Sequence, residues 1–308
     1  MRVGLDVGGT KTDAVAIDDA GTVVSRVRLA TGWGADAVVA TVFEAVQALR
    51  EQMDAASPEF RSVGIGIPGQ VVPGTTRVTH AVNLGVDELD LAAAVSPTLG
   101  VPVHVENDVK AASLGGYALH GATGTMGYLN LGTGIAAGIV EDGVLMRGRH
   151  GTAGEIGHIS VDPNGPLCRC GQRGCIEALA GGRSIAERWG RVSAFPVLDV
   201  FDAADAGDLL AAELRNGLAA GAAAAVRVLV LTVDVDTVVI GGGVTNLGAR
   251  LMRDIAADLD ASATASPFMR SLSLSARVSL LPAGSPAAAL GAALLGEARN
   301  TEGVLAHG

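Results

Sequence analysis

The most constraining feature of this sequence is a histidine followed by three clustered cysteines. His158 precedes Cys168, Cys170 and Cys175, and the 308 residues contain no other cysteine. One imidazole and three thiolates form a complete tetrahedral set for zinc, and a site closed by four protein ligands is structural rather than catalytic. We therefore expect a zinc-fixed loop that holds neighbouring side chains in place.

The alternative is that the three cysteines are ordinary buried residues, which are common in protein cores. Their clustering and the interleaved Gly171 and Gly174 favour the zinc interpretation. Three cysteines cannot pair completely in disulfides, and a zinc–thiolate site suits a reducing compartment. The sequence also begins with an apolar strand pattern instead of a signal segment. We expect a cytoplasmic protein.

Composition limits the partners that this chain can bind. The net charge of −10 argues against nucleic acid, because sequence-independent binding needs a basic face. The most apolar stretch, residues 218–233, is too short to cross a bilayer and contains Arg227, so we expect no membrane partner. The 43 glycines should lie mostly in tight turns or where backbone approaches a ligand.

The apolar patterns predict a duplicated α/β unit. A strand, a glycine-rich turn and a second strand occur twice, near residues 3–18 and 127–141. We place a first domain at residues 1–118, with a C-terminal helix (287–308) returning to it, and a second domain at 119–286 that carries the zinc loop. Strands are predicted at 2–7, 12–18, 23–29, 63–67, 101–105, 127–131, 135–141, 144–146, 237–240 and 277–281, and helices at 35–53, 89–99, 109–119, within 184–233 and at 287–299.

Glycine-rich turns follow three of the predicted strands. The segments 6–12 and 132–134 expose backbone N–H groups that can cradle phosphate, and Asp6 is placed to hold Mg²⁺ directly or through water. Residues 241–243 could pass a purine over bare backbone. Each turn alone is equally compatible with an ordinary hairpin or strand-to-helix turn. Two of them at matching places in a duplicated unit favour a phosphate site, although neither is a P-loop.

Polar side chains complete the candidate site. Asn107 and Asp108 begin a predicted helix, so they could be caps; in a cleft, Asp108 could instead take a proton from a sugar hydroxyl while Asn107 binds neighbouring hydroxyls. Glu155, His158 and Glu177 flank the cysteines. Lone side chains of these types are usually structural or solvated, but on a rigid loop they could recognise a polyol. One nitrogen of His158 could bind zinc and the other a hydroxyl.

These segments resemble the ROK family of sugar kinases and repressors, in family order, from residue 3 to about residue 295. The cysteine segment is the most specific part, whereas the glycine turns are shared with the wider actin/hexokinase-like ATPase superfamily. The segments that carry the resemblance are 6–11, 67–69, 106–108, 131–134, 154–158, 168–177 and 241–244.

The resemblance implies an α/β, actin-like ATPase fold, in which two α/β domains with ribonuclease-H-like sheets surround a cleft. It implies ATP, Mg²⁺ and phosphorylation of a hexose or N-acetylhexosamine, commonly at O6, with Asp108 as the catalytic base. The implied sugar-binding residues are Gly69, Asn83, Asn107, Asp108, Glu155, His158 and Glu177. The implied ATP- and Mg²⁺-binding residues are Asp6, Gly8, Gly9, Thr10, Lys11, Thr12, Gly132, Thr133, Gly134, Gly242 and Gly243. Kinases of this family are often homodimers or homotetramers, and we expect one here.

One departure from the family pattern concerns the sugar. Family glucokinases usually carry a tryptophan shortly after the asparagine that matches Asn83, whereas this chain continues Leu84-Gly85-Val86-Asp87. The sequence therefore leaves the sugar open among glucose, mannose and the N-acetylhexosamines. It also leaves open whether polyphosphate can replace ATP.

Two other functions belong to the same resemblance. A sugar-responsive repressor needs a helix-turn-helix of roughly 60–80 residues before the first strand, where this sequence has only Met1. A non-catalytic sugar sensor would not need Asp108 or the two glycine turns. We therefore expect an ATP-dependent sugar kinase.

Overall fold

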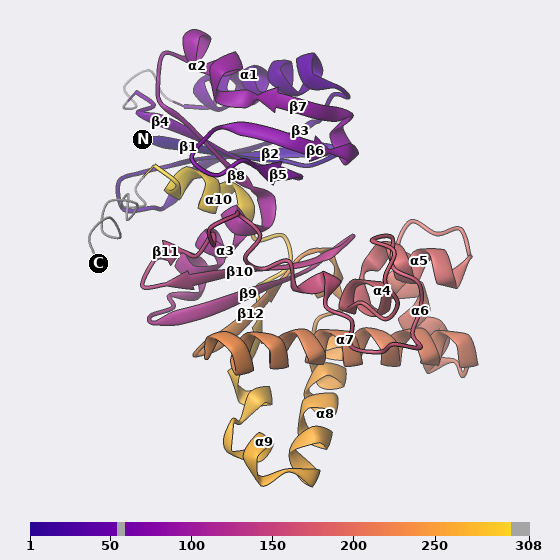
Figure 1. Cartoon of the computed structure of the whole chain (residues 1–308). Coiled ribbons are helices and arrows are strands. Elements are labelled where there is room, and N and C mark those ends of the chain that lie inside the picture. Colours follow the sequence, from indigo (N-terminus) through magenta and orange to yellow (C-terminus); the bar gives the residue numbers. More distant parts are fainter. Residues whose placement is uncertain (54–58, 297–308) are drawn as a thin grey trace. The chain divides into compact units, whose positions relative to one another are not determined.

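The computed structural model describes residues 1–53 and 59–296, which form two compact units (Figure 1). The first unit contains residues 1–123, residues 139–153 and the chain from Pro286 onward, and the second contains residues 124–138 and 154–285. These units differ from the predicted domains mainly by the segments 119–123 and 139–153, which lie in the first unit. The part of the predicted C-terminal helix beyond residue 296 lies outside the described residues.

A five-stranded sheet in the order β3-β2-β1-β4-β8 forms the centre of the first unit. The first three strands are an antiparallel meander, as predicted, and β4 and β8 continue the sheet in parallel. Helix α1 covers one face, and α10 and α3 cover the other (Figure 1). The elements of this layer are β1 (Arg2–Val7), β2 (Lys11–Ile17), β3 (Val23–Ala30), β4 (Ser62–Ile67), β8 (Val103–Asn107), α1 (Ala35–Glu51), α2 (Leu91–Leu99), α3 (Asp108–His120) and α10 (Ala287–Leu294).

The second five-stranded sheet has the matching order β11-β10-β9-β12-β13, which confirms the predicted duplication. Its strands β9 and β12 pair in parallel, like β1 and β4. The elements are β9 (Thr125–Leu131), β10 (Ile135–Glu141), β11 (Val144–Leu145), β12 (Thr237–Gly241), β13 (Val278–Leu280), α4 (Ile176–Ala180), α5 (Gly182–Trp189), α6 (Pro196–Asp205), α7 (Leu209–Val233), α8 (Ala249–Ala265), α9 (Pro267–Ser271) and the short 3₁₀ helices η2 (Ile156–His158), η3 (Gly243–Leu247) and η4 (Leu274–Arg277).

The sequence prediction missed a small antiparallel sheet in the first unit. It consists of β5 (Gln70–Val71), β6 (Arg77–Ala81) and β7 (Val86–Asp90), with the 3₁₀ turn η1 (Val82–Leu84) between the last two strands. The helix predicted from residue 89 begins at Leu91, because the Asp90 side chain accepts a hydrogen bond from the N–H of Ala93 and caps it. This sheet presents Asn83, one of the predicted sugar-binding residues.

Helix α7 is longer than the apolar stretch suggested. It spans 25 residues and is, within the described part of the chain, the one helix long and apolar enough to cross a membrane. Half of its most apolar window is buried inside the protein. Arg215 and Arg227 on this helix form ion pairs with Asp254 and Asp258 of α8, at 2.6 and 2.7 Å. These are the features of a packed core helix.

Glycines let helix α10 lie directly on the backbone of its neighbours. A methyl group at Gly64 of β4 would lie 1.8 Å from the carbonyl oxygen of Ala292, and one at Gly4 of β1 would lie 2.0 Å from that of Ala289. At Gly115 of α3 the corresponding distance to Ala287 is 1.8 Å. No side chain fits at these positions unless the helix moves.

We expect the substitution Gly64→Val to lower the free energy of unfolding by about 3 kcal/mol, the upper end of the usual cost of overpacking a core. Gly21→Ala is the control, since Gly21 has a φ of +81° but no atom within 4 Å of an added methyl group. That change should cost about 1 kcal/mol of backbone strain. Urea unfolding of both variants measures the difference, and equal losses would contradict the packing described here.

Candidate functional site

The turn between β1 and β2 brings backbone donors and carboxylates together in the first unit. The N–H of Gly8 donates to the carbonyl of Lys11 at 3.1 Å, which closes the turn. A methyl group at Gly9 would lie 2.7 Å from the carbonyl oxygen of Asn83, so only glycine fits between the turn and η1. Thr10 and Lys11 are exposed at the tip of the turn.

Asp6, at the end of β1, lies in surroundings that disfavour its negative charge. Burial, and then the negative charges of Asp108 and Asp13, raise its pKa to about 7. Asp13 lies opposite Asp6 in the strand register. Burial also acts on Asp13, but hydrogen bonds from Arg28 and Arg26 hold the pKa of that carboxyl below its ordinary value. A cation bound at Asp6 would balance this crowded negative charge, which fits the predicted Mg²⁺ role of Asp6.

Asn107 caps helix α3, so the capping interpretation of this segment is correct for that residue. Its Oδ1 accepts hydrogen bonds from the N–H groups of Val109 and Lys110, at 3.0 and 3.2 Å. Its Nδ2 donates to the carbonyl of Gly69 at 3.1 Å, so the amide also joins β8 to the turn after β4. Asp108 is the first residue of the helix that Asn107 caps.

Glu106 and Arg147 support this helix start, and the sequence reading gave them no role. The Glu106 side chain is 7% exposed and forms an ion pair with Arg147 at 2.6 Å. Its other oxygen accepts a hydrogen bond from the N–H of Asn107 at 3.0 Å. Lys110, whose Nζ donates to the carbonyl of Gly151, is buried beside it. These contacts explain why residues 139–153 belong to the first unit.

In the second unit, Glu177 stabilises the turn Gly132–Gly134 by a hydrogen bond to the residue that follows it. The Glu177 Oε2 accepts a hydrogen bond from the N–H of Ile135 at 2.9 Å, and a methyl group at Gly134 would lie 2.5 Å from the same oxygen. The N–H groups of Gly182 and Arg183 donate to the carbonyls of Gly132 and Thr133, at 2.9 and 3.0 Å. Glu177 thus supports the predicted phosphate turn, a role that the sequence reading did not assign to it.

Two glycines explain the motif around Glu155 and His158. Methyl groups at Gly154 and Gly157 would lie 1.9 and 2.0 Å from the carbonyls of Ala137 and Ile135, so both glycines lie directly on strand β10. The N–H of Ala137 donates to the carbonyl of Gly154 at 2.7 Å. The segment is therefore fixed to the strand, while Glu155 and His158 themselves are exposed.

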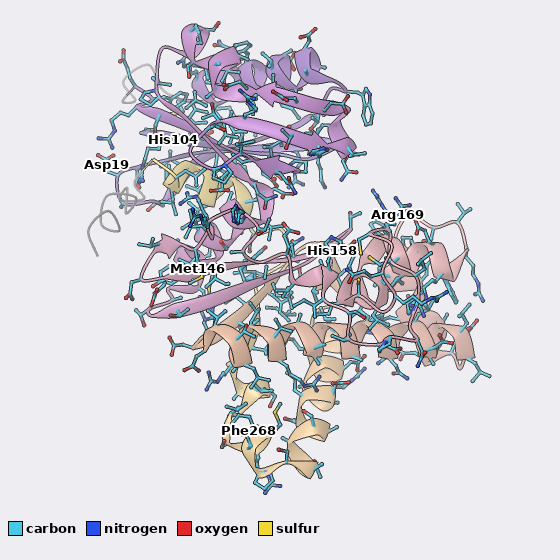
Figure 2. All side chains as sticks on the ribbon, viewed as in Figure 1. Asp19, His104, Met146, His158, Arg169 and Phe268 are labelled. Carbon is cyan, nitrogen blue, oxygen red and sulfur yellow. The ribbon has the colours of Figure 1, made fainter. Side chains whose placement is uncertain are left out.

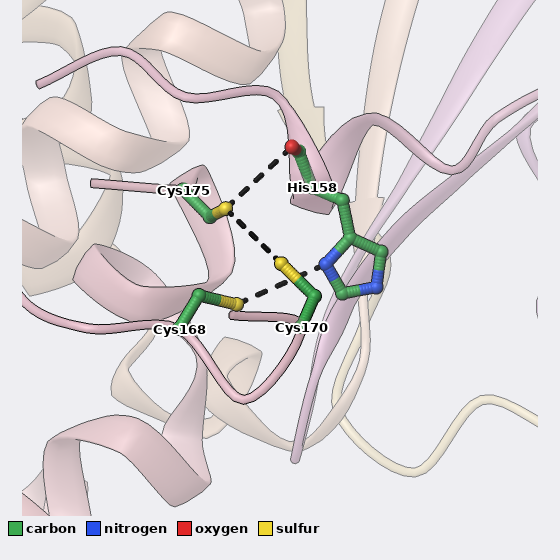
Figure 3. Close-up of side chains that lie close together, drawn as sticks. All are labelled: His158, Cys168, Cys170 and Cys175. Atoms are coloured by element: carbon green, nitrogen blue, oxygen red, sulfur yellow. Dashed lines mark hydrogen bonds between the residues drawn. The ribbon is translucent and has the colours of Figure 1, made fainter. Parts of the chain in front are cut away.

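His158 and the three cysteines converge on one point (Figure 3). Their ligand atoms all lie within 4.8 Å of one another, with Cys170 Sγ 3.6 Å from Cys175 Sγ and Cys168 Sγ 3.9 Å from His158 Nδ1. Sulfur atoms about 2.3 Å from a tetrahedral zinc lie about 3.8 Å apart. The arrangement therefore fits a zinc ion held by three thiolates and Nδ1, and the other ring nitrogen of His158 points away from the sulfurs.

The thiols differ in how readily they ionise. Hydrogen bonds from Gln172 lower the pKa of Cys170 to about 6, whereas burial raises the pKa of Cys175 to about 12. Cys170 is therefore more readily ionised than Cys175. Since a metal ligand must be deprotonated, binding at this cluster would release protons.

The glycines after β12 divide into packed and open positions. A methyl group at Gly241 would lie 2.0 Å from the hydroxyl of Tyr128, and one at Gly242 would lie 2.4 Å from the carbonyl of Leu131. Only Gly243 has no atom within 4 Å of an added methyl group. A ligand can therefore approach the bare backbone at Gly243, while Gly242 is needed for packing and for its φ of +91°.

The predicted site residues are divided between the two units. The first unit carries Asp6, Gly8, Gly9, Thr10, Lys11, Thr12, Gly69, Asn83, Asn107 and Asp108, and the second carries Gly132, Thr133, Gly134, Glu155, His158, Cys168, Cys170, Cys175, Glu177, Gly242 and Gly243. Two matching sheets, each with a glycine turn after its first strand, define an actin-like ATPase fold. Comparison with known proteins gives the same class.

The chain belongs to the ROK family, whose sequence model matches residues 2–299. It is 30% identical to a glucokinase from Halalkalibacterium halodurans, over 85% of this chain and 86% of that protein. It is 32% identical to an N-acetylmannosamine kinase from Yersinia pseudotuberculosis, over 82% and 86%. A ROK family glucokinase from Streptomyces griseus, solved in complex with glucose and AMPPNP, superposes with a TM-score of 0.74 and 32% identity, over 95% and 97% of the two chains.

The raised pKa of Asp6 predicts a pH-dependent effect of removing its charge. Because folding raises this pKa from 3.8 to about 7, the folded protein loses stability as pH rises through that range. Asp6→Asn should therefore stabilise the ligand-free protein more at pH 8 than at pH 5, by on the order of 2 kcal/mol. Thermal unfolding at both pH values measures this gain.

Asp13→Asn is the matched control, because the pKa of Asp13 is lowered by its arginine partners. Losing these ion pairs should destabilise the protein at pH 8, the opposite sign. A pH-independent effect of Asp6→Asn would contradict the electrostatic account of Asp6.

Proposed function

We propose that this protein is an ATP-dependent sugar kinase that transfers the γ-phosphate of ATP to a hydroxyl of a hexose or N-acetylhexosamine, at O6. The single observation that carries the proposal is Asp108 at the capped start of α3, beside Asp6 and the β1–β2 turn. A proton acceptor next to a phosphate-binding turn is what phosphoryl transfer to an alcohol requires. The similarity to named glucokinases and an N-acetylmannosamine kinase supports the same reaction class.

Asp108 would take the proton of the attacking hydroxyl. A positioned general base contributes typically 10²–10⁴-fold to the rate. Asn107 accepts two hydrogen bonds from the start of the helix and donates a third to Gly69, and buried Glu106 fixes Asn107 in turn. The base is therefore carried on a rigid element, as efficient proton transfer requires.

The two glycine turns would hold the phosphates of ATP by backbone N–H groups, and Asp6 would hold Mg²⁺. The metal ion, when bound with ATP, neutralises charge that develops on the transferred group. Gly243 would leave room for the adenosine. In the second turn, the carboxylate of Glu177 accepts a hydrogen bond from the N–H of Ile135 and so keeps the turn in its conformation.

The cysteine cluster would hold a structural zinc ion. Its donor set and its spacing fit tetrahedral zinc, and the ion would lock η2, which carries His158, to α4, which carries Glu177. The outward ring nitrogen of His158 and the carboxylate of Glu155 would then bind sugar hydroxyls.

Several finer points remain proposals. The relatives are named for different sugars, glucose and N-acetylmannosamine. We propose both as substrates, and a panel of hexoses and N-acetylhexosamines would distinguish them. ATP is the proposed phosphate donor, and polyphosphate is the alternative to test beside it.

A cytoplasmic location and a homodimeric or homotetrameric state are likewise predictions. A protein that binds sugar but transfers no phosphate would instead be a sensor.

We expect Asp108→Asn to lower kcat for sugar phosphorylation at least 100-fold, since it removes the proposed base. Binding of an ATP analogue, measured by calorimetry, should change less than about threefold because Asp108 has no role in holding nucleotide. Asp19→Asn is the control, because Asp19 is an exposed carboxylate of the β2–β3 turn paired with Arg61 (Figure 2). Near-normal turnover by Asp108→Asn would refute the assigned base.

Zinc removal should act on sugar affinity. Chelation, or Cys170→Ser, should loosen the loop between η2 and α4, next to whose ends Glu155 and Glu177 lie. It should raise the sugar KM about tenfold, because the energy of metal ligation also orders the loop. The control is Glu187→Gln, which removes only the surface ion pair between α5 and Arg169 of the loop (Figure 2). Unchanged sugar KM in a zinc-free Cys170→Ser protein would rule out the organising role.

A further inference from the structure

An exposed tryptophan lies against the segment that follows Asn83. Trp33, in the turn between β3 and α1, is 71% exposed. Its indole nevertheless rests on Gly85: a methyl group there would lie 2.5 Å from Trp33 Cε2 and Nε1 and 2.9 Å from Cζ2. Gly85 also has a φ of +67°, which favours glycine. The indole can lie against Gly85 because glycine has no side chain that would displace it.

The turn that carries Trp33 is fastened at both sides. The N–H of Gly34 donates to the carbonyl of Leu84 at 2.8 Å, and the N–H of Thr31 donates to the carbonyl of Thr10 at 3.1 Å. The hydroxyl of Thr31 is 2.8 Å from that of Thr12. The turn is therefore tied to η1 on one side and to the β1–β2 glycine turn on the other.

These ties place three kinds of group on one stretch of the first unit. The indole of Trp33 lies on Gly85, the exposed Asn83 comes two residues earlier, and the carbonyl of Asn83 lies against Gly9 of the glycine turn. Tryptophan is enriched at binding interfaces, because it combines a large apolar ring with a polar N–H. A stretch of chain that carries both an aromatic ring and an amide suits a pyranose, which has apolar C–H faces and a rim of hydroxyls.

We infer that Trp33 is a sugar-binding residue of this protein. Its indole packs against the C–H face of the sugar ring, while Asn83 binds the hydroxyls at the rim. It supplies the aromatic contact that the run Leu84-Gly85-Val86-Asp87 does not contain. This inference rests on the proposed function, because it assigns a residue to the sugar side of the same site. The inference gives Trp33 no role toward phosphate or the proposed base, so it predicts an effect on sugar affinity alone.

Steady-state kinetics with glucose and with N-acetylmannosamine test the inference. Trp33→Ala should raise the KM of the sugar that is phosphorylated about 5–10-fold, the loss expected for one aromatic stacking contact. Trp33→Phe should raise it less, and kcat and the KM for ATP should stay within about twofold of the wild type. Phe268→Ala is the matched control, since Phe268 is a 62% exposed aromatic residue on α9 (Figure 2).

Gly85→Ala provides a second route to the same prediction, because its methyl group would push the intact indole from its seat. It should raise the sugar KM as Trp33→Ala does. A sugar KM within twofold of the wild type in both Trp33→Ala and Gly85→Ala would overturn the inference and leave the proposed kinase function in place.

Fluorescence gives a readout that does not depend on turnover. The chain has two tryptophans, and Trp189 is only 4% exposed. Saturating sugar should change the emission of the wild type and leave that of Trp33→Phe unchanged. An equal change in both proteins, or none in the wild type at a concentration that saturates turnover, would overturn the inference. A wild type that phosphorylates no sugar of the panel would instead refute the proposed function, and this inference with it.

Discussion

The convergence of His158 and three cysteine sulfurs is the constraint on which the predicted site residues of the second unit depend. The segment between η2 and α4 has almost no apolar core of its own: its buried cluster consists of Cys168, Cys175 and Ala178. It is folded by turns and two isolated β-bridges instead. Without ligand bonds to an ion, little would hold such a loop, because a few exposed backbone hydrogen bonds contribute little free energy of folding. A zinc ion bound at this cluster would supply that energy.

Ordering this loop has consequences at both of its ends. At one end, Gly154 and Gly157 lie on β10 and leave Glu155 and His158 facing outward. At the other end, α4 directs Glu177 to the N–H of Ile135, which follows the glycine turn. A zinc ion bound here would thus stabilise both the groups proposed to bind sugar and the turn proposed to bind phosphate. In the first unit, the buried Glu106 and the cap formed by Asn107 hold the start of α3 in place.

The sequence was sufficient for the parts of the fold that depend on local pattern. Continuous apolar runs identified the central strands of both sheets, and the clustering of His158 and the cysteines in the sequence predicted four side chains that the structure brings together. It failed where tertiary contacts decide. Strands β5 to β7 are short and largely exposed, so they lack an apolar run. The role of Glu177 depends on a hydrogen bond to a residue 42 positions away, and Trp33 reaches Gly85 only because two turns are tied together.

The metal content of the purified protein tests the central claim most directly. Elemental analysis combined with X-ray absorption at the zinc edge reports both the amount of metal and the atoms that bind it. Our account predicts one zinc per chain, bound by three sulfurs at about 2.3 Å and one nitrogen at about 2.0 Å. A fully folded, active protein with no bound metal, or with a disulfide between Cys170 and Cys175, would contradict it.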